Sequence, residues 1–402
     1  MTGKSELKGI LVLIGIIIVI GFIMSALSGN LEKWFGIKWF SGPNLLDAIV
    51  YVSEKDGAAD LFSMSVDGDN KKKLTNNYNV SSLPSISNTG RRILFAGRSG
   101  ENSNIYIMPA KGGEPQIFTT ATGPKAHPQF SPDSNKASYM ASGRVYIAET
   151  DGKSASQVLP TQQQMREVMH IGGEKKTPLY KSYYWTQDSK GMVGVTSENE
   201  SDMIIYVPSF SEDAAFIAGI MQIENGKTAF VMLPDFSSEP AAIEVSSKAK
   251  FRVKDMVFSK NKALLFVSAN IEKGSLLLAF DKEKNLPPIL MQTTEYEFFD
   301  LTLSPDDSIL FACFELKADE PNIPKFGIVA ITLSSGNFDV IAEGKFSDIS
   351  ISPDGNNILA TIHDDTKRDV AVINLSNDIV KKITDDGKSY YAIWTPTSEN
   401  KK

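Results

Sequence analysis

Residues 346–362 read FSDISISPDGNNILATI, and this stretch decides the fold. Its first six residues alternate between apolar and polar side chains, as a strand with one buried face does. The tetrapeptide Ser-Pro-Asp-Gly at residues 352–355 then turns the chain, because Pro fixes φ, Asp bonds backbone amides and Gly accepts positive φ. A second apolar run follows at residues 357–362. The stretch therefore predicts two antiparallel strands joined by a tight corner.

The same corner, intact or degenerate, returns along the chain. The intervals cluster near forty-odd residues, which is the period of a propeller blade. Each copy is followed by an apolar, β-prone run, so every unit is expected to contribute four antiparallel strands with short turns. The corner residues that begin each copy are Ser87, Ser131, Thr186, Ser259, Ser304, Ser352 and Thr395.

The two ends of the repeat region complete one another. Residues 390–396 are an inner strand and its corner, whereas residues 48–52 begin a blade that lacks its first strand. Pairing these segments closes the ring and leaves no open sheet edge. A weak strand–turn–strand around Glu224 adds an eighth corner, so we expect an all-β, closed β-propeller of eight blades over residues 48–396. The count is seven if residues 183–247 form one blade with an insertion.

An apolar segment precedes the repeats. Residues 9–29 carry no charged side chain, and about 20 apolar residues are enough to span a bilayer as a helix. We therefore expect a single transmembrane helix there, after a short tail at residues 1–8. The alternative is a cleaved signal peptide, which would release a secreted propeller. Lys and Arg are nearly balanced across the segment, and the amino terminus tips the orientation toward a propeller on the extracytoplasmic, periplasmic side.

A linker at residues 30–47 joins this segment to the propeller. Aromatic side chains alternating with Lys are typical of the headgroup level of a bilayer. The membrane-interface residues expected in the linker are Trp34, Phe35, Trp39 and Phe40. At the other end of the chain, residues 397–402 are expected to form a short tail.

Composition excludes several function classes. The net charge of −7 argues against general affinity for nucleic acid, which depends on Lys and Arg at phosphates. The single Cys313 allows no intrachain disulfide and is expected to be a buried apolar side chain. His127, His170 and His363 are too widely spaced to predict a metal centre. The chain contains no Gly-x-Ser-x-Gly elbow and no phosphate-binding loop, so neither an enzyme nor a cofactor is expected.

Several repeat motifs carry a family resemblance. The corner at residues 130–133, the strand at 105–107, the turn at 151–152 and the closing pair at 74–75 resemble the repeats of TolB-like propellers. The resemblance covers residues 48–396 and is weak in the middle. It implies a periplasmic protein that binds other envelope proteins. The chain departs from that family because the separate N-terminal α/β domain is replaced by the apolar segment.

Two insertions interrupt the even period, at residues 161–181 and 315–325. Loops on a rigid scaffold are where binding residues usually lie. The candidate partner contacts in these insertions are Met165, Arg166, Met169, His170, Asn322 and Lys325.

The expected function is a non-enzymatic, membrane-anchored platform for protein interaction, such as an accessory or scaffold subunit of a larger membrane complex. Its expected partners are the bilayer, through residues 9–29, and other membrane or envelope proteins. The alternative is an enzyme or a receptor for a small ligand or metal that uses the central channel. A polar cluster of His, Asp and Arg in the channel would favour this alternative.

Overall fold

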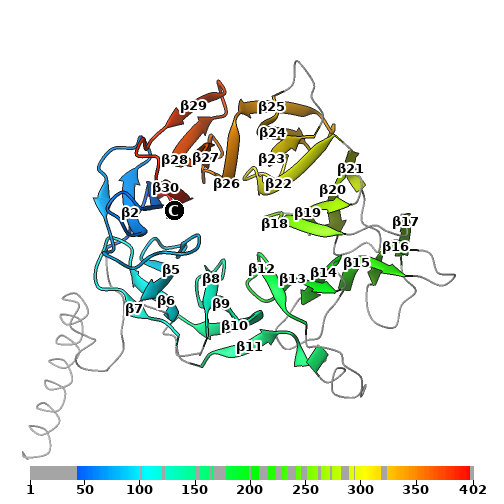
Figure 1. The fold of residues 1–402 in the computed structure, drawn as a ribbon, viewed down its shortest axis with the longest axis horizontal. Coiled ribbons are helices and arrows are strands. Elements are labelled where there is room, and N and C mark those ends of the chain that lie inside the picture. Colours follow the sequence, from blue (N-terminus) through cyan, green and yellow to red (C-terminus); the bar gives the residue numbers. More distant parts are fainter. Residues whose placement is uncertain are drawn as a thin grey trace, which may run out of the picture. The chain divides into compact units, whose positions relative to one another are not determined.

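The described residues form seven antiparallel β-sheets that follow one another round a central axis (Figure 1). The computed structural model describes residues 43–398 except 100–101, 120–122, 151–153, 163, 166–177, 199–200, 208–215, 223–227, 234–240, 246–250, 261–263, 272–273, 282–288, 294 and 318–323. Each sheet is one blade, and its strands run in order from the axis to the rim. The predicted all-β propeller is confirmed.

The first blade contains both ends of the repeat region. Its strands are β30 (Ser389–Trp394), β1 (Ala48–Ser53), β2 (Asp60–Ser65) and β3 (Lys72–Lys73), in that order. Trp394 lies opposite Ile49, and Tyr390 lies opposite Val52. The ring is therefore closed by hydrogen bonds between segments more than 300 residues apart in the sequence.

Blades 2 to 4 follow along the chain. Their strands are β4 (Ser85–Ile86), β5 (Arg92–Ser99), β6 (Asn102–Pro109) and β7 (Gln116–Ile117); β8 (Lys125–Phe130), β9 (Lys136–Ala141), β10 (Arg144–Glu149) and β11 (Ser156–Leu159); and β12 (Tyr180–Trp185), β13 (Met192–Glu198), β14 (Ser201–Val207), β15 (Phe216–Gln222), β16 (Thr228–Leu233) and β17 (Ala241–Val245).

Blades 5 to 7 complete the ring with four strands each. Their strands are β18 (Arg252–Phe258), β19 (Leu264–Ile271), β20 (Gly274–Asp281) and β21 (Ile289–Thr293); β22 (Tyr296–Leu303), β23 (Ile309–Leu316), β24 (Phe326–Thr332) and β25 (Phe338–Glu343); and β26 (Lys345–Ile351), β27 (Asn357–Asp364), β28 (Lys367–Asn374) and β29 (Ile379–Lys382).

The preferred count of eight blades is wrong, and the alternative of seven is correct. The strand–turn–strand around Glu224 consists of β15 and β16, which extend blade 4 outward to six strands. Ile204 of β14 lies opposite Ala218 of β15, so β15 takes the usual place of a fourth strand. The chain stays in the same sheet here because β15 pairs with β14 and β16 with β15, whereas in the other blades the chain returns to the axis after the fourth strand.

The predicted corners are closed by the same side-chain bonds in several blades. The Ser352 hydroxyl donates to the Asp354 carboxylate and accepts the backbone N–H of Asn357 at 2.9 Å. Ser131 and Ser304 repeat this arrangement with Asp133 and Asp306. The corner aspartates are therefore occupied within their own turns.

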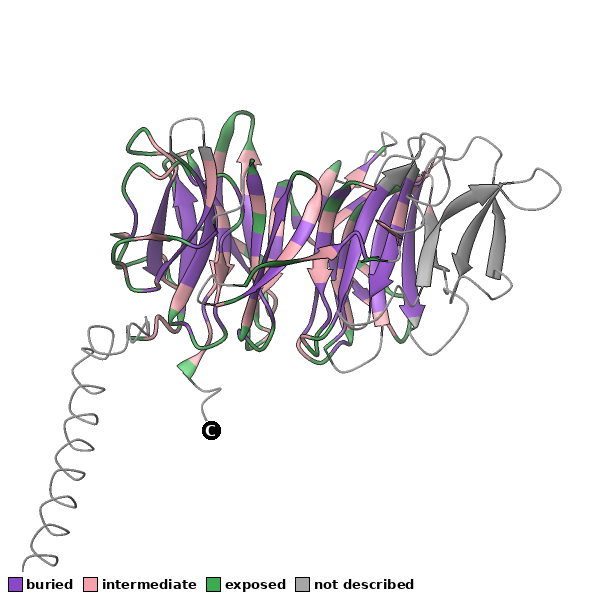
Figure 2. Ribbon diagram, turned by 90° about the horizontal axis from the view of Figure 1, so that it is seen from below, coloured by how far each residue is buried: buried purple, intermediate pink, exposed green. Residues whose placement is uncertain are grey.

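The hydrophobic core lies between adjacent blades, and Figure 2 shows buried residues in most of the described strands. One cluster joins Phe266 and Leu277 of blade 5 to Phe298 and Phe314 of blade 6. Another joins the closing blade to blade 2 through Val52 and its neighbours. Each blade therefore depends on its neighbours for burial of its apolar faces.

The two faces of the ring carry different connections. The corners join first and second strands at one face, here called the corner face, where Leu45 N–H bonds Gly90 and Asp47 N–H bonds Pro396. The opposite face carries the hairpins between second and third strands and the links between blades. Both predicted insertions belong to connections of the opposite face, between β11 and β12 and between β23 and β24.

The segment before the propeller lies outside the described residues. The expected transmembrane helix at 9–29 therefore remains a prediction, as do the interface positions Trp34, Phe35, Trp39 and Phe40. In the described part of the chain, no helix is long and apolar enough to cross a membrane.

Candidate functional site: the central channel

The residue four positions before each corner lies on or beside the innermost strand, and six of the seven such residues line the central cavity. In most blades a register shift interrupts the pairing of the innermost strand at or beside this position. His127, Asp300, Asp348 and Tyr391 also have φ between +48° and +54°, which Asp tolerates better than most residues. The seven positions, in chain order, are Leu83, His127, Ser182, Asp255, Asp300, Asp348 and Tyr391.

Residues from all seven blades line one cavity of about 410 Å³, which is within the usual size of small-ligand sites. The cavity is chemically divided. Blades 5, 6 and 7 contribute Asp255, Asp300 and Asp348, whereas Leu83 and Ile393 of blades 2 and 1 are apolar. Leu83 is 42% exposed, so this side of the channel offers free apolar surface.

Asp255 is held between two neighbouring blades. Its Oδ1 accepts a hydrogen bond from the Tyr184 hydroxyl of blade 4 at 2.6 Å. Its Oδ2 accepts the backbone N–H of Leu301 in blade 6, also at 2.6 Å. Burial raises the pKa of Asp255 despite these bonds, and the charge of Asp348 adds to the rise.

Asp300 lies between the other two carboxylates in the blade order. Its Oδ2 accepts the backbone N–H of Asp348 at 2.8 Å, again across a seam between blades. Burial and the charge of Asp255 raise the pKa of Asp300 to about 7. This carboxyl therefore exchanges its proton near neutral pH, far above the ordinary range of aspartate.

Asp348 is bonded within its own blade. Its Oδ2 accepts the hydroxyls of Ser347 at 3.0 Å and Thr361 at 3.2 Å. The Ser347 hydroxyl also lies 2.8 Å from Nε2 of His363. Burial raises the pKa of Asp348 and lowers that of His363. The imidazole that contacts Ser347 is therefore neutral near pH 7.

The channel therefore concentrates negative charge on one side. None of the three aspartates makes an ion pair with a described residue. In the part of the chain that the structure describes, no three His, Cys, Asp or Glu side chains are arranged to hold a metal ion. The arrangement suits an organic cation with an apolar portion, because carboxylates and exposed apolar side chains face the same cavity.

The predicted contact residues are only partly described. Met165 is half-buried in a short helical turn, with its N–H bonded to the Thr161 carbonyl at 3.1 Å. Lys325 is exposed just before β24. These two residues belong to different parts of the ring, between blades 3 and 4 and in blade 6. The remaining candidates, Arg166, Met169, His170 and Asn322, lie outside the described residues.

The channel carboxylates were missed in the sequence, although a signal for them exists. Asp255, Asp300 and Asp348 each lie four residues before a corner Ser at 259, 304 or 352. Three aspartates in the same place of three consecutive repeats could have been found by aligning the corners.

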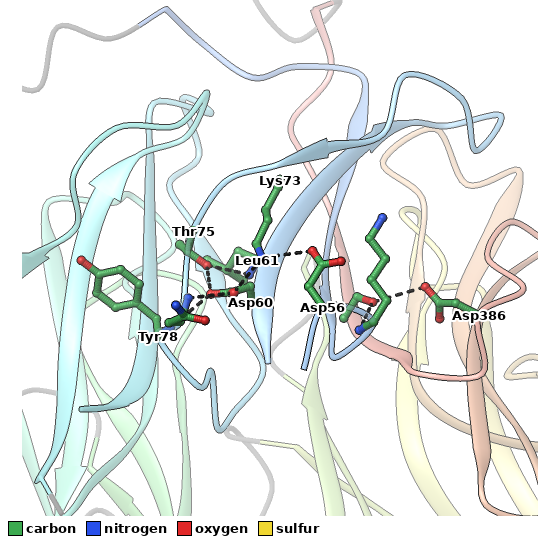
Figure 3. A network of polar contacts seen from close by, with 10 residues as sticks. Asp56, Asp60, Leu61, Lys73, Thr75, Tyr78 and Asp386 are labelled. Atoms are coloured by element: carbon green, nitrogen blue, oxygen red, sulfur yellow. Dashed lines mark hydrogen bonds and ion pairs between the residues drawn. The ribbon is translucent and has the colours of Figure 1, made fainter. Parts of the chain in front are cut away.

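A second polar cluster, at the seam of blades 1 and 2, is structural (Figure 3). Asp60 at the start of β2 is fully buried. It accepts the Thr75 hydroxyl at 2.8 Å and the backbone N–H groups of Asn77 and Tyr78 at 2.9 and 3.1 Å. Asp369 of β28 repeats this arrangement. The cluster fixes the link to the next blade, and Lys73 forms an ion pair with the same carboxylate at 3.2 Å.

Comparison with known proteins assigns the fold. No protein-family model and no curated protein matches the chain. TolB from Acinetobacter baumannii is 12% identical, with a TM-score of 0.50 over 91% of this chain and 70% of that one. A puromycin-hydrolysing peptidase from Mycobacterium tuberculosis is 12% identical, with a TM-score of 0.56 over 86% of this chain and 53% of that one. A protein from Lactobacillus plantarum is 11% identical, with a TM-score of 0.50 over 88% and 97%.

These identities bear on the fold alone. The chain spans about half the length of the peptidase and most of the length of the other two proteins. Together with the seven closed blades, the likenesses identify the domain as a β-propeller with a TolB-like fold.

Proposed function

We propose that this propeller is a non-enzymatic binding protein that receives a cationic side chain of a partner protein in its central channel. The observation that supports the proposal is the convergence of Asp255, Asp300 and Asp348 from three consecutive blades on one cavity. This chemistry favours a propeller that binds a ligand in its channel over a propeller that serves only as a spacer.

The two sides of the cavity match the two parts of an arginine or lysine side chain. A guanidinium or ammonium group bonds carboxylates strongly, at about 1.5–3 kcal/mol for each charged hydrogen bond. The aliphatic stem gains from contact with apolar surface, which Leu83 and Ile393 supply here. Among the described residues the carboxylates accept no charged donor, so binding breaks no ion pair of this part of the chain.

The proposal keeps the membrane-anchored platform as its setting. An anchor at residues 9–29 would hold the propeller beside partners in the same membrane and raise their effective concentration. On this proposal the propeller lies on the extracytoplasmic side, and the insertions around Met165 and Lys325 provide secondary contacts on the opposite face.

The test uses the full-length protein in mild detergent and isothermal titration calorimetry. The probe is a short peptide with one arginine between leucines, compared with the same peptide carrying glutamine in its place. We expect binding of the arginine peptide only, and a loss of affinity of about tenfold or more in Asp255→Asn. Asp339→Asn, at an exposed position of β25, is the matched control and should bind normally. Equal binding of both peptides, or an unaffected Asp255→Asn variant, would reject the proposal.

One observation favours a second candidate function, an enzyme that uses the channel. A carboxyl with a pKa of about 7, as at Asp300, is suited to general acid–base chemistry. Mass spectrometry of the arginine peptide after prolonged incubation separates the two functions. An intact peptide is the result expected of a binding protein, whereas cleavage that disappears in Asp300→Asn would identify an enzyme.

A further inference from the structure

We propose that Asp255, Asp300 and Asp348 act as a proton-operated clasp, in which proton uptake by the channel tightens the seams between blades 5, 6 and 7. The device lies in the fold itself and does not require a ligand. It is therefore independent of the proposed binding of a cationic side chain.

The geometry joins the channel to the seams through single carboxyl groups. Asp255 accepts the Leu301 N–H with Oδ2, and Asp300 accepts the Asp348 N–H with Oδ2. Each bond links a side chain of one blade to the backbone of the next, at a bulge of the innermost strand. A change of charge in the cavity therefore acts directly on the contact between adjacent blades.

The groups that face this trio provide little positive charge. From the other elements, Tyr184 faces Asp255, and Cys313 lies near all three carboxyls. Burial raises the pKa of both groups well above the usual values, so they stay neutral at physiological pH. His127 lines the same cavity, and burial lowers its pKa, so its imidazole is neutral near pH 7.

The remaining facing groups lie beside Asp348. They are His363, Tyr391, Arg368 and Lys345. Burial lowers the pKa of His363 and raises that of Tyr391. The charge of Arg368 lowers the pKa of both Asp348 and His363, and the charge of Lys345 in β26 lowers that of His363. Asp300 is influenced instead by the charges of Asp255 and Asp348, both of which raise its pKa.

The direction of the pH effect follows from this arrangement. Burial disfavours the charged form of each of the three aspartates, and the charges of Asp255 and Asp348 act further against ionisation of Asp300. The trio therefore binds protons more tightly in the closed ring than in an opened seam, where the carboxyls return toward a pKa of about 3.9. Closure of these seams is favoured as the pH falls from about 8 toward 6 and is weakened as it rises.

The test measures hydrogen exchange at the backbone amides of Leu301 and Asp348, the two donors of the seam bonds. Exchange is followed in the full-length protein without peptide, and each rate is corrected for intrinsic base catalysis. Opening of a seam releases one proton from a carboxyl group of pKa about 7. We therefore expect the protection factors to be about tenfold higher near pH 6 than near pH 8. The amides of Asn77 and Tyr78, which bond Asp60 at another seam, are the internal control and should not change.

The variant Asp300→Asn completes the test. Asn accepts the same backbone φ and can still accept the Asp348 N–H, but it cannot titrate. We expect its protection factors at Leu301 and Asp348 to be the same at both pH values and close to the acid values of the wild type. A pH dependence unchanged in Asp300→Asn would overturn the proposal.

A second measurement covers the case in which the variant does not fold. Carboxyl carbon resonances of the wild-type aspartates should show at least one group titrating between about pH 6 and 8. If all described aspartates titrate below about pH 5, the clasp is rejected. The peptide titration of the preceding subsection is separate, so failure of either proposal can be recognised by itself.

Discussion

The guanidinium of Arg368 lies over the ring of Tyr390, 3.6 Å from the ring centroid. Arg368 belongs to β28 of blade 7, whereas Tyr390 belongs to β30, the strand that closes blade 1. Glu54 joins the same contact, because it accepts the Tyr390 hydroxyl and lies 3.3 Å from Arg368. The contact between blades 7 and 1 is therefore held by a stacked cation as well as by apolar packing.

Replacement of Arg368 should weaken this seam. Arg368→Ala removes the stacking and a half-exposed ion pair, so we expect a loss of about 1 kcal/mol in the free energy of unfolding. Arg368→Lys keeps the charge but loses the planar stacking group. Its free energy of unfolding should lie between those of the wild type and of Arg368→Ala. Denaturant unfolding of the wild type and the two variants measures these free energies. An alanine variant as stable as the wild type would show that the apolar packing between blades 7 and 1 is sufficient to hold this seam.

Asp60 should be far less tolerant of substitution. It is fully buried, and although burial alone raises its pKa, the bonds from Asn77, Tyr78 and Thr75 hold that pKa below the usual value. Asp60→Ala leaves these donors unpaired, and we expect a loss of about 3 kcal/mol or more. Because the folded pKa is lowered, the stabilisation is present above about pH 4 and is lost as the pH falls further.

Chemical denaturation near pH 7 measures the effect of Asp60→Ala. Asp369→Ala should behave in the same way, since Asp369 bonds Thr384 and Gly387 at the equivalent place of blade 7. Asp67→Ala, at an exposed turn, is the control and should unfold like the wild type. A small effect at Asp60 with a large one at Asp67 would contradict the structural role given to these positions.

The fold was largely predictable because its signal is local. A corner such as residues 352–355 needs Pro, Asp and Gly for backbone reasons, so it can be read without knowledge of any distant contact. The blade count was not predictable to the same extent. Residues 219–231 contain two strand-like runs, and whether such a hairpin starts a blade or extends one depends on its pairing with Ile204 and its neighbours in β14.

The channel was considered as an alternative site, but the residues that line it were not predicted, for a related reason. Asp348 and Asp354 lie six residues apart and look alike in the sequence, yet one faces the cavity and the other caps its own turn. Their difference arises from the bulge of β26 at residues 348–349, which directs the side chain to the axis. Only the closed ring brings Asp348 near Asp255, which is 93 residues earlier in the sequence.

Binding of the arginine peptide should depend on pH. Protons compete with the peptide for the channel carboxyls, and Asp300 has a pKa of about 7. Since arginine stays charged throughout this range, we expect the affinity to be about tenfold lower near pH 6 than near pH 8. Calorimetry at several pH values measures the slope, and Asp300→Asn should bind more weakly with little pH dependence. An affinity that rises on acidification would contradict a site made of these carboxylates.

The β16–β17 hairpin of blade 4 should be dispensable for the ring. β15 pairs with β14 where other blades have their fourth strand. β15 and β17 run in the same direction, because each is antiparallel to β16. The C-terminal ends of β15 and β17 therefore lie at the same end of the sheet. A chain that leaves β15 can continue to β18 as it now does from β17. Deletion of residues 223–245, bridged by a short Gly-Ser linker, preserves the topology.

We expect this deletion variant to unfold cooperatively, with a Tm within a few degrees of the wild type, because β16 and β17 are the outermost strands of their sheet and the other six blades have four strands each. Deletion of residues 216–245 is the matched comparison. It also removes β15, leaves the edge of β14 unpaired and should lower the Tm much more. Calorimetry of both variants measures the difference. If the shorter deletion unfolds the ring while the longer one does no additional harm, then blade 4 requires all six strands, and the hairpin is part of the propeller core rather than an addition at its rim.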